Sequence, residues 1–410
     1  MHTGTWIALA VLGQTLGASP AQTWTVDDNG PADFASIQSA IDAVAPGDVL
    51  LIQPGDYAPF TLAKELALLG PAAGPKPHVA GRSAILGAPT FTLAGLHLDA
   101  LSVGGVPGRA SIDACLFDRR VSGDATLALA DCDELVLSRS TVQPLDCFVF
   151  HALEPGVRIA NSRFAIVEST LVGAPGCIGG IYEWGDGGHA LVVSGGTGTL
   201  SATAIYGGDA GGECGAFGCA GCCSGAQGTG LSLGSGARIV ARGAGQWIQG
   251  GHSFNSGGLG IRATDAGTKI SVSGYSIDPV SITGGAEIAY AGGATPEPLL
   301  ALPGLDVAGA TRSLELYGTG GVTGLVYAAL GTGYAVLPGL DGSIWLDAGA
   351  LEFVVALTPP ANLVADALDV AVPPLAGLAG LRFTAQAVCP TQSTPAGMLL
   401  TNPVELILRF

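Results

Sequence analysis

The sequence predicts an all-β protein: a right-handed parallel β-helix with an N-terminal capping helix, followed by a small C-terminal antiparallel β-sandwich. Three observations support this prediction: a composition rich in glycine and apolar residues, a short helix followed at once by a strand, and a pattern that recurs at coil length. Together they divide the chain into a signal peptide over 1–21, the β-helix with its cap over 22–293, a linker over 294–303 and the sandwich over 304–410.

Composition restricts both the fold and the partners. Of 410 residues, 48% are hydrophobic, 12% are charged and 65 are glycine, which is too apolar for a disordered chain and too rich in glycine for a helical one. The formal net charge of -17 argues against binding nucleic acid or anionic membranes, which requires a basic surface. The same charge disfavours polyanionic substrates, so uncharged glycans are easier to accommodate. We expect no cofactor and no metal.

The segment 1–21, MHTGTWIALAVLGQTLGASPA, has the features of a secretory signal peptide. An apolar run from Trp6 to Leu16 precedes Ser19-Pro20-Ala21, which places small residues at the two positions a signal peptidase reads. The alternative is a buried N-terminal strand or helix, because the segment before the run lacks Lys and Arg. The run is shorter than the roughly 20 residues that span a bilayer. We therefore expect a secreted, extracellular or cell-surface protein without a transmembrane segment.

The mature chain opens with one short amphipathic helix and a strand. Within DFASIQSAIDAVAPGDVLLIQPGDY, residues 33–57, apolar residues recur at helical spacing, Asp33 or Ser36 can cap the helix, and Pro46-Gly47 ends it. Val49–Ile52 then reads as a buried strand. Such a unit can cover the apolar cross-section at the end of a stack of β-coils. The segment resembles the entrance of right-handed parallel β-helix proteins of the pectin-lyase-like superfamily. This resemblance implies the fold of the following coils but no activity, because lyases, hydrolases, esterases and adhesins share it.

A six-residue pattern, apolar-x-x-small-x-apolar, recurs along the middle of the chain. It starts at Phe91, Ile112, Leu137, Ile159, Leu200 and Ile270, with Ala94, Cys115, Ser140, Ser162, Thr203 and Ser273 as the small residues. The first three steps are similar in length and fit one coil each, whereas the two later steps are longer and fit two and three coils with inserted loops. The alternative is a β-sandwich with incidental strand similarity.

Between residues 187 and 290, strand segments alternate with glycine-rich excursions. Loops that leave a β-helix on one side are where such folds place binding and catalytic groups. After the proline-rich ATPEPLLALP, residues 294–303, short runs such as LELYG and GLVYAAL separated by turns predict the antiparallel β-sandwich. The ending, residues 367–410, resembles a C-terminal module of many secreted bacterial proteins, which implies attachment, sorting or binding.

The strongest chemical constellation is YEWGDGGH, residues 182–189. Glu183, Asp186 and His189 are the predicted catalytic groups, with either carboxylate as acid or base, and Tyr182 and Trp184 can stack on a sugar ring. A further aromatic candidate for ligand binding is Trp247. The alternative is an ordinary polar loop. Motifs of polygalacturonases, pectate lyases and pectin esterases are absent, which argues against a pectinolytic role.

Two weaker patterns concern charged residues. Arg119, Arg139 and Arg158 recur at an interval close to one coil and could form a cationic groove; salt-bridged surface is the alternative. The histidines His78, His97, His151 and His252 lack metal-ligand spacing, and the sequence predicts no role for them.

Secretion predicts that most of the nine cysteines are paired. Cys214, Cys219, Cys222 and Cys223 cluster within ECGAFGCAGCCSG, where we predict two local disulfides, because adjacent cysteines suit a tetrahedral Zn²⁺ poorly. Two further pairs are predicted among Cys115, Cys132, Cys147 and Cys177, which leaves Cys389 free.

Two functional hypotheses follow from these features. The first is a secreted or cell-surface protein that binds glycans or other surface material without catalysis, as an adhesin or envelope component. The alternative is a carbohydrate-active enzyme, a polysaccharide lyase or glycoside hydrolase, of unrecognised specificity. A purely structural repeat is the third possibility.

Overall fold

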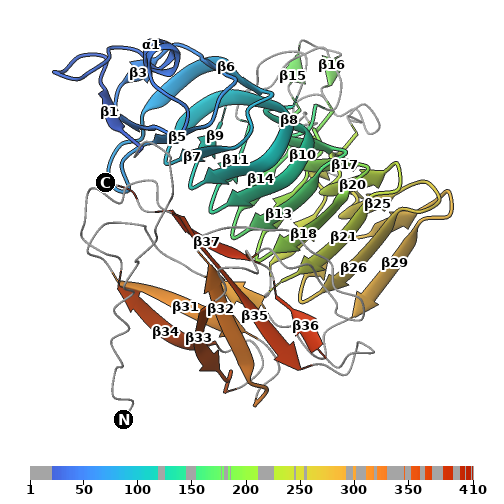
Figure 1. Cartoon of the computed structure of the whole chain (residues 1–410). Coiled ribbons are helices and arrows are strands. Elements are labelled where there is room, and N and C mark those ends of the chain that lie inside the picture. The colour runs from blue at the N-terminus through green and yellow to red at the C-terminus, as the bar shows by residue number, and fades with distance from the viewer. Residues whose placement is uncertain are drawn as a thin grey trace.

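The predicted fold class is confirmed. A parallel β-helix is followed by two small antiparallel sheets that lie against its side (Figure 1). The computed structural model describes residues 21–118, 125–144, 154–176, 178–179, 183–184, 186–210, 226–243, 246–253, 256–291, 299–301, 311–317, 321–329, 346, 352–360, 365–371, 382–390, 398–401, 403–407 and 409. Over these residues, no helix has the length and apolar character needed to cross a bilayer.

The N-terminal cap is the helix α1 (Ile37–Ala43). Ser36 is its N-cap residue, and the Ser36 hydroxyl accepts a hydrogen bond from the Ser39 amide at 3.2 Å. Asp33, the other predicted cap, instead accepts from the amide and hydroxyl of Thr25. Buried side chains on one face of the helix, including Ile37 and Ile41, join the core of the first coils. The helix therefore covers the apolar end of the β-helix, as its position in the sequence predicts.

Each coil of the β-helix contributes a strand to three parallel sheets, and β6 (His78–Leu86), β8 (His97–Asp113) and β10 (Leu127–Ser138) bend from one sheet into the next. The docking sheet contains β1 (Thr23–Val26), β2 (Val49–Ile52), β5 (Leu66–Leu69), β7 (Phe91–Ala94), the ends of β8 and β10, β13 (Arg163–Val167), β18 (Thr197–Ser201), β21 (Arg238–Arg242), β26 (Lys269–Ser273) and β29 (Glu287–Ala291). The groove sheet contains β3 (Asp56–Tyr57), the starts of β6 and β8, β9 (Leu116–Phe117), β11 (Thr141–Val142), β14 (Thr170–Val172), β19 (Ala204–Tyr206), β22 (Trp247–Gln249) and β27 (Ser276–Ile277). The third sheet contains β4 (Thr61–Leu62), central parts of β6 and β8, the start of β10, β12 (Val157–Ala160), β17 (Leu191–Ser194), β20 (Leu231–Gly234), β25 (Ile261–Ala263) and β28 (Val280–Ile282).

Single residues in the left-handed conformation turn the chain between sheets. At the corner between the docking and groove sheets, Ala114, Arg139, Glu168 and Ala202 have φ of 46 to 49°. A second corner, between the third and docking sheets, uses Asp131 and Asn161 in the same way, followed by Cys132 and Ser162. Both corners thus place a small residue directly after a left-handed one, and one sequence pattern describes both.

Because the two corners have the same sequence pattern, the register predicted from that pattern is partly wrong. The pattern starting at Ile112, Leu137 and Leu200 does mark one column of the core, but the member of that column in the intervening coil is Ile166. Ile159 belongs to the third sheet, where it pairs with Leu129 and Val193. The patterns starting at Phe91 and Ile270 are out of register by two positions, because Leu93 and Val272 occupy the column instead.

The predicted disulfides of Cys115 and Cys132 are wrong, because both residues are buried free thiols. Each fills a small corner position inside the β-helix, and each thiol donates to a backbone carbonyl two positions earlier at 3.4 Å. Their amides donate to the hydroxyls of Ser140 and Ser162, the small residues of the next coil. Burial raises the pKa of both thiols to about 11. The six other cysteines predicted to pair, at positions 147, 177, 214, 219, 222 and 223, lie outside the described residues.

The C-terminal part forms two antiparallel sheets with a shared core. One contains β30 (Leu299–Ala301), β31 (Thr311–Tyr317) and β34 (Asp366–Ala371); the other contains β32 (Gly324–Ala329), β33 (Glu352–Leu357), β35 (Arg382–Pro390), β36 (Met398–Leu400) and β37 (Val404–Ile407). Apolar residues of both sheets, such as Leu316 and Val326, belong to one buried cluster. Strand β30 falls within the predicted linker 294–303 and pairs with β31.

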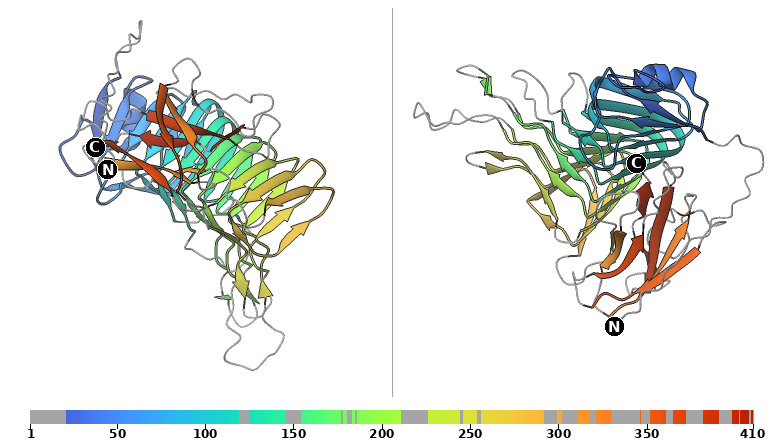
Figure 2. Two further views of the ribbon diagram at one scale, coloured as in Figure 1. Left: turned by 90° about the horizontal axis from the view of Figure 1, so that it is seen from below. Right: turned by 90° about the vertical axis from the view of Figure 1, so that its left-hand side faces the viewer.

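These C-terminal sheets cover the outward face of the docking sheet (Figure 2). Val136, Ala165 and Val167 point outward from the coils, yet each is at most 2% exposed because it packs into the C-terminal cluster. Nearer the cap, Ile407 of β37 packs against Val49 and other outward residues of the first coils. The β-helix and the C-terminal sheets therefore share an extended apolar interface.

Two arginines, the half-buried Arg382 and the buried Arg242, add polar contacts to this interface. Arg382 on β35 donates to the hydroxyls of Ser111, at 3.2 Å, and Thr92, at 2.8 Å. From the β-helix side, Arg242 donates to the Leu400 carbonyl at 2.9 Å, and only 2% of Arg242 is exposed. These hydrogen bonds fix the C-terminal sheets to defined coils.

Backbone segments beyond the groove sheet pack directly on one another through glycines. We call residues 173, 187–188, 207–208, 228, 250–251 and 258 the glycine layer. The layer has two walls of backbone: residues 187–188, 228 and 258, which precede strands of the third sheet, and residues 173, 207–208 and 250–251, which follow strands of the groove sheet. Hydrogen bonds cross between these walls. The Gly208 amide donates to the Gly188 carbonyl at 2.8 Å, the Gly228 amide to the Gly208 carbonyl at 2.9 Å, and the Gly251 amide to the Gly228 carbonyl at 2.8 Å. A Cβ atom on Gly228 would lie 1.9 Å from the Gly188 carbonyl oxygen. Only glycine permits this approach.

Candidate functional site

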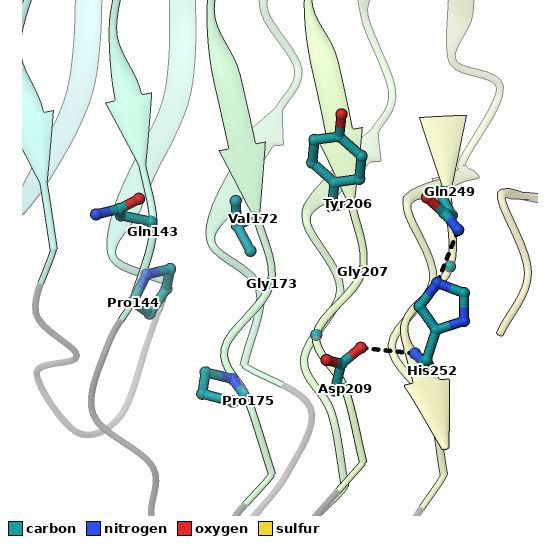
Figure 3. Close-up of a pocket in the computed structure, with 12 residues that line it drawn as sticks. Gln143, Pro144, Val172, Gly173, Pro175, Tyr206, Gly207, Asp209, Gln249 and His252 are labelled. Atoms are coloured by element: carbon teal, nitrogen blue, oxygen red, sulfur yellow. Dashed lines mark hydrogen bonds between the residues drawn. The ribbon is translucent and has the colours of Figure 1, made fainter. Parts of the chain in front are cut away.

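A groove runs across the strands where the groove sheet meets the glycine layer (Figure 3). It encloses about 410 Å³. Gln143, Val172, Tyr206 and Gln249 lie at equivalent positions of four successive coils and point out of the sheet into the groove. Because neighbouring strands are about 4.8 Å apart, these four side chains extend over roughly 14 Å. The groove therefore suits an extended ligand that lies across the strands.

Polar groups on the glycine-layer side complete the groove. Asp209 accepts a hydrogen bond from the His252 amide at 2.7 Å, and the His252 ring nitrogen Nε2 lies 2.7 Å from Gln249 Nε2 (Figure 3). These contacts hold a carboxylate, an amide and an imidazole beside the ring of Tyr206. Hydroxyl groups of a ligand would find both hydrogen-bond donors and acceptors here.

Trp247 is an exposed aromatic side chain next to the groove. It begins β22, two positions before the groove residue Gln249, and 45% of its surface is exposed, whereas Ile248 between them is fully buried. Alternation along the strand places Trp247 and Gln249 on the same outward face. The sequence prediction that Trp247 is available to a ligand thus agrees with its position, and its binding role stays a prediction.

Two histidines and three carboxylates form a cluster on the same outward face, nearer the cap. His78 contacts Asp56 through Nδ1 at 3.0 Å and Asp99 through Nε2 at 2.9 Å. The ring of His97, one coil further, lies 4.6 Å from that of His78 between centroids, and its Nε2 is 2.7 Å from Asp118. A histidine oriented by a carboxylate can act as a general base. In the next strand, the neighbour of Asp118 is Gln143, so this cluster and the groove are continuous.

Burial lowers the pKa of His78, but its hydrogen bonds to Asp99 and Asp56 outweigh burial and hold the pKa above its ordinary value. The protonated ring then stabilises the folded state below about pH 6.5, and this contribution is lost as the pH rises through the folded-state pKa. We expect the difference in free energy of unfolding between wild type and His78→Gln to be larger at pH 6 than at pH 9, measured by urea titration. In an Asp56→Asn background the pH dependence should shrink, and a difference that is independent of pH would contradict the assignment.

The constellation at 182–189 is only partly described. Glu183 and Trp184 form strand β16 (Glu183–Trp184), which pairs with β15 (Ile178–Gly179), and Tyr182 lies outside the described residues. Asp186 accepts a hydrogen bond from the Ala226 amide at 2.6 Å. His189 accepts through Nδ1 from the Thr229 amide at 3.0 Å, and burial, followed by the charge of Arg262, lowers its pKa. Asp186 and His189 thus join neighbouring backbone segments, and the catalytic role of the three residues stays a prediction.

The two described arginines of the recurring set, Arg139 and Arg158, do not line a common groove. Arg139 lies at a corner and pairs with the buried Asp113 at 2.7 Å, whereas Arg158 belongs to β12 of the third sheet. Arg119 lies outside the described residues. Equal sequence spacing therefore does not place these residues on one face.

The sequence reasoning missed the histidine cluster. The interval from His78 to His97 equals that from Asp99 to Asp118 and is close to one coil, and this equal spacing could have indicated stacked positions on one face. Within the described ranges, no group of three or more His, Cys, Asp or Glu side chains has an arrangement that could hold a metal ion.

The fold and the groove together define a β-helix protein with an outward-facing site that crosses several coils. No protein-family model and no curated protein sequence matches the chain. Among solved structures it is similar to tailspike protein 2 of Escherichia coli O157:H7 bacteriophage CAB120, with 10% identity, 95% of this chain and 64% of that chain covered, and a TM-score of 0.22. The chain therefore spans less than two thirds of that tailspike.

Two further solved structures show a similar level of likeness. The A-module of a mannuronan C-5 epimerase from Azotobacter vinelandii is 14% identical, with 62% of this chain and 90% of that chain covered and a TM-score of 0.18. The tailspike of Acinetobacter baumannii phage AM24 is 9% identical, with 90% and 69% covered and a TM-score of 0.17. The assignment of the β-helix rests on the strand register of this chain.

Proposed function

We propose that this chain is a secreted or cell-surface protein that binds polysaccharide along its groove sheet. The observation that carries the proposal is the position of Trp247, whose exposed ring lies beside a groove formed by equivalent residues of successive coils. An exposed indole offers an apolar face for a sugar ring, while Gln143, Gln249 and Asp209 can bond its hydroxyl groups. The repeating unit of an extended glycan is similar in length to the strand spacing of about 4.8 Å.

Trp247→Ala is expected to weaken binding of the glycan at least tenfold, because the stacking platform is lost while the buried part of β22 is unchanged. The ligand is first selected by screening the wild-type protein on a glycan array, and its Kd is then measured by calorimetry for wild type and variant. Leu86→Ala is the matched control, since Leu86 is an exposed apolar residue of β6 next to the third sheet.

Two results would overturn this proposal. One is a wild-type protein that binds no glycan on the array. The other is a Trp247→Ala variant that binds as tightly as the Leu86→Ala control.

A carbohydrate-active enzyme is the second candidate, and the His97–Asp118 pair favours it. The two groups lie 2.7 Å apart on the same face as the groove, where His97 could accept a proton from a bound glycan or from water. Incubating the selected glycan with wild type and with His97→Asn tests this candidate. Product that appears with both proteins, or with neither, would exclude this pair as a catalytic centre for that glycan.

A further inference from the structure

The groove is framed by carboxylates at both ends. One strand before Gln143, the equivalent position is Asp118, and one strand after Gln249 it is Asp278. Backbone hydrogen bonds fix this order, since the Gln143 amide donates to the Phe117 carbonyl at 2.8 Å and the Asp278 amide to the Ile248 carbonyl at 3.2 Å. Each acidic residue therefore lies about 4.8 Å, in backbone terms, from a groove residue.

A third carboxylate lies inside the groove, and two more lie in the neighbouring cluster. Asp209 is part of the groove lining, and Asp56 and Asp99 flank His78. The Asp56 side chain is 89% exposed, so its charge faces solvent on the same side as the groove. Five carboxylates thus border one continuous surface.

In the groove lining and at the outward positions of the groove sheet, histidine is the only positively chargeable residue among those described; Lys76 lies at the neighbouring corner, where it donates to the Ala114 carbonyl. Over the residues described, the groove lining and the two outward columns of the groove sheet include no Lys or Arg. One column consists of Asp56, His78, His97, Leu116, Thr141, Thr170, Ala204, Trp247 and Ser276, and the other of Asp99, Asp118, Gln143, Val172, Tyr206, Gln249 and Asp278. Arg139, at the corner beside the groove sheet, is paired with Asp113. The groove therefore has a negative potential, and the net charge of -17 on the whole chain reinforces it.

We propose that the groove selects glycans that carry protonated amino groups. This inference rests on the proposed function and specifies its substrate class. A sugar that stacks on Trp247 places its neighbours along the column of groove residues, toward Tyr206 and Gln143 on one side and Asp278 on the other. Ammonium groups on such a chain would come near Asp209, Asp118 or Asp278, whereas the carboxylates of a polyuronate would be repelled at the same places.

The test compares three hexasaccharides with the wild-type protein at pH 6. Chitosan and chitin hexasaccharides share one backbone and differ in whether the amines are free or acetylated, and hexagalacturonate supplies the anionic case. We expect the chitosan oligomer to bind about tenfold more tightly than the chitin oligomer at low salt, because two or more screened charge pairs contribute. This difference should shrink at about 0.5 M NaCl, and hexagalacturonate should bind most weakly.

Charge-removing variants connect the preference to the groove. The double variant Asp118→Asn/Asp278→Asn should reduce the chitosan preference over the chitin oligomer to less than about twofold. Asp42→Asn is the matched control, because Asp42 is exposed on α1 at the capped end and should leave the preference unchanged. Unfolding midpoints of all variants show whether each is folded.

The outcomes separate this inference from the proposed function. Equal binding of the chitosan and chitin oligomers, tighter binding of hexagalacturonate, or a preference that survives in the double variant would overturn the substrate class and leave glycan binding intact. If none of the three hexasaccharides binds, the substrate class fails; if the glycan array is also negative, or if Trp247→Ala binds its glycan as well as wild type, both proposals fail.

Discussion

Val167→Asp is expected to lower the free energy of unfolding by about 3–5 kcal/mol, because it places an unpaired carboxylate in an apolar interface. Val167 is 2% exposed and packs outward from β13 into the cluster shared with the C-terminal sheets. The interior of the coil is untouched by this substitution, since the inward neighbour Ile166 remains. The loss therefore reports on how firmly the C-terminal sheets hold the β-helix.

Val192→Asp on β17 is the matched control, because Val192 also points outward but is only half-buried, on the third sheet. We expect it to cost less than about 1 kcal/mol. Chemical denaturation measures both values, and limited proteolysis of Val167→Asp should release the C-terminal sheets first. Equal losses for the two variants would show that the C-terminal sheets do not depend on this face.

Gly228→Ala, in the glycine layer, is expected to lower the free energy of unfolding by at least about 3 kcal/mol. The added Cβ would meet the Gly188 carbonyl oxygen at 1.9 Å and the Gly208 amide nitrogen at 2.7 Å. Neither wall can move away without breaking the hydrogen bonds that cross between them, such as that from Gly228 to Gly208 at 2.9 Å. Separation of the walls would also deform the groove, so ligand affinity should fall together with stability.

Gly257→Ala is the control for this substitution. A Cβ there meets no atom within 4 Å, and Gly257 is on the short strand β24 (Ser256–Gly257) of the same region. Its melting temperature should stay near the wild-type value, while that of Gly228→Ala should fall by several degrees at least. Similar melting temperatures for the two variants would falsify the tight packing of the walls.

The start of the fold could be predicted from the sequence because its signals are local. The helical spacing from Phe34 to Val44, the cap and the following strand all lie within the segment 33–57. The structure begins the helix at Ile37, after Phe34, and places the strand where the pattern indicates. The predicted register of later coils failed for a physical reason: in the middle coils, two different corners each use a left-handed residue followed by a small one, as at Asn161-Ser162 and Glu168-Ser169. A short pattern cannot tell the Ser162 corner from the Ser169 corner, although they face different sheets.

The site was harder to predict because its residues come from separate coils. Trp247 was named from the sequence as an aromatic candidate for ligand binding. Tyr206 and Val172, however, belong to the two preceding coils, and inserted loops separate them from Trp247 in the sequence. The cysteines failed in a different way. The expected secretion of the protein and its number of cysteines argue for disulfide bonds. Cys115 and Cys132 are instead small core residues, at positions that serine occupies in the next coil.

The covered face of the docking sheet has a consequence for the order in which the protein folds. The chain is synthesised from its N-terminus, so the coils are complete before the segments that will cover them have left the ribosome. Until then the face stands open to solvent and to other nascent chains. Its outward positions are largely small or hydroxylated, as at Thr92, Ser111, Ala165 and Ser201, and such a surface attracts other apolar chains less than one of leucine or phenylalanine. The composition of this face thus suits both its final contact and the interval of synthesis that precedes it.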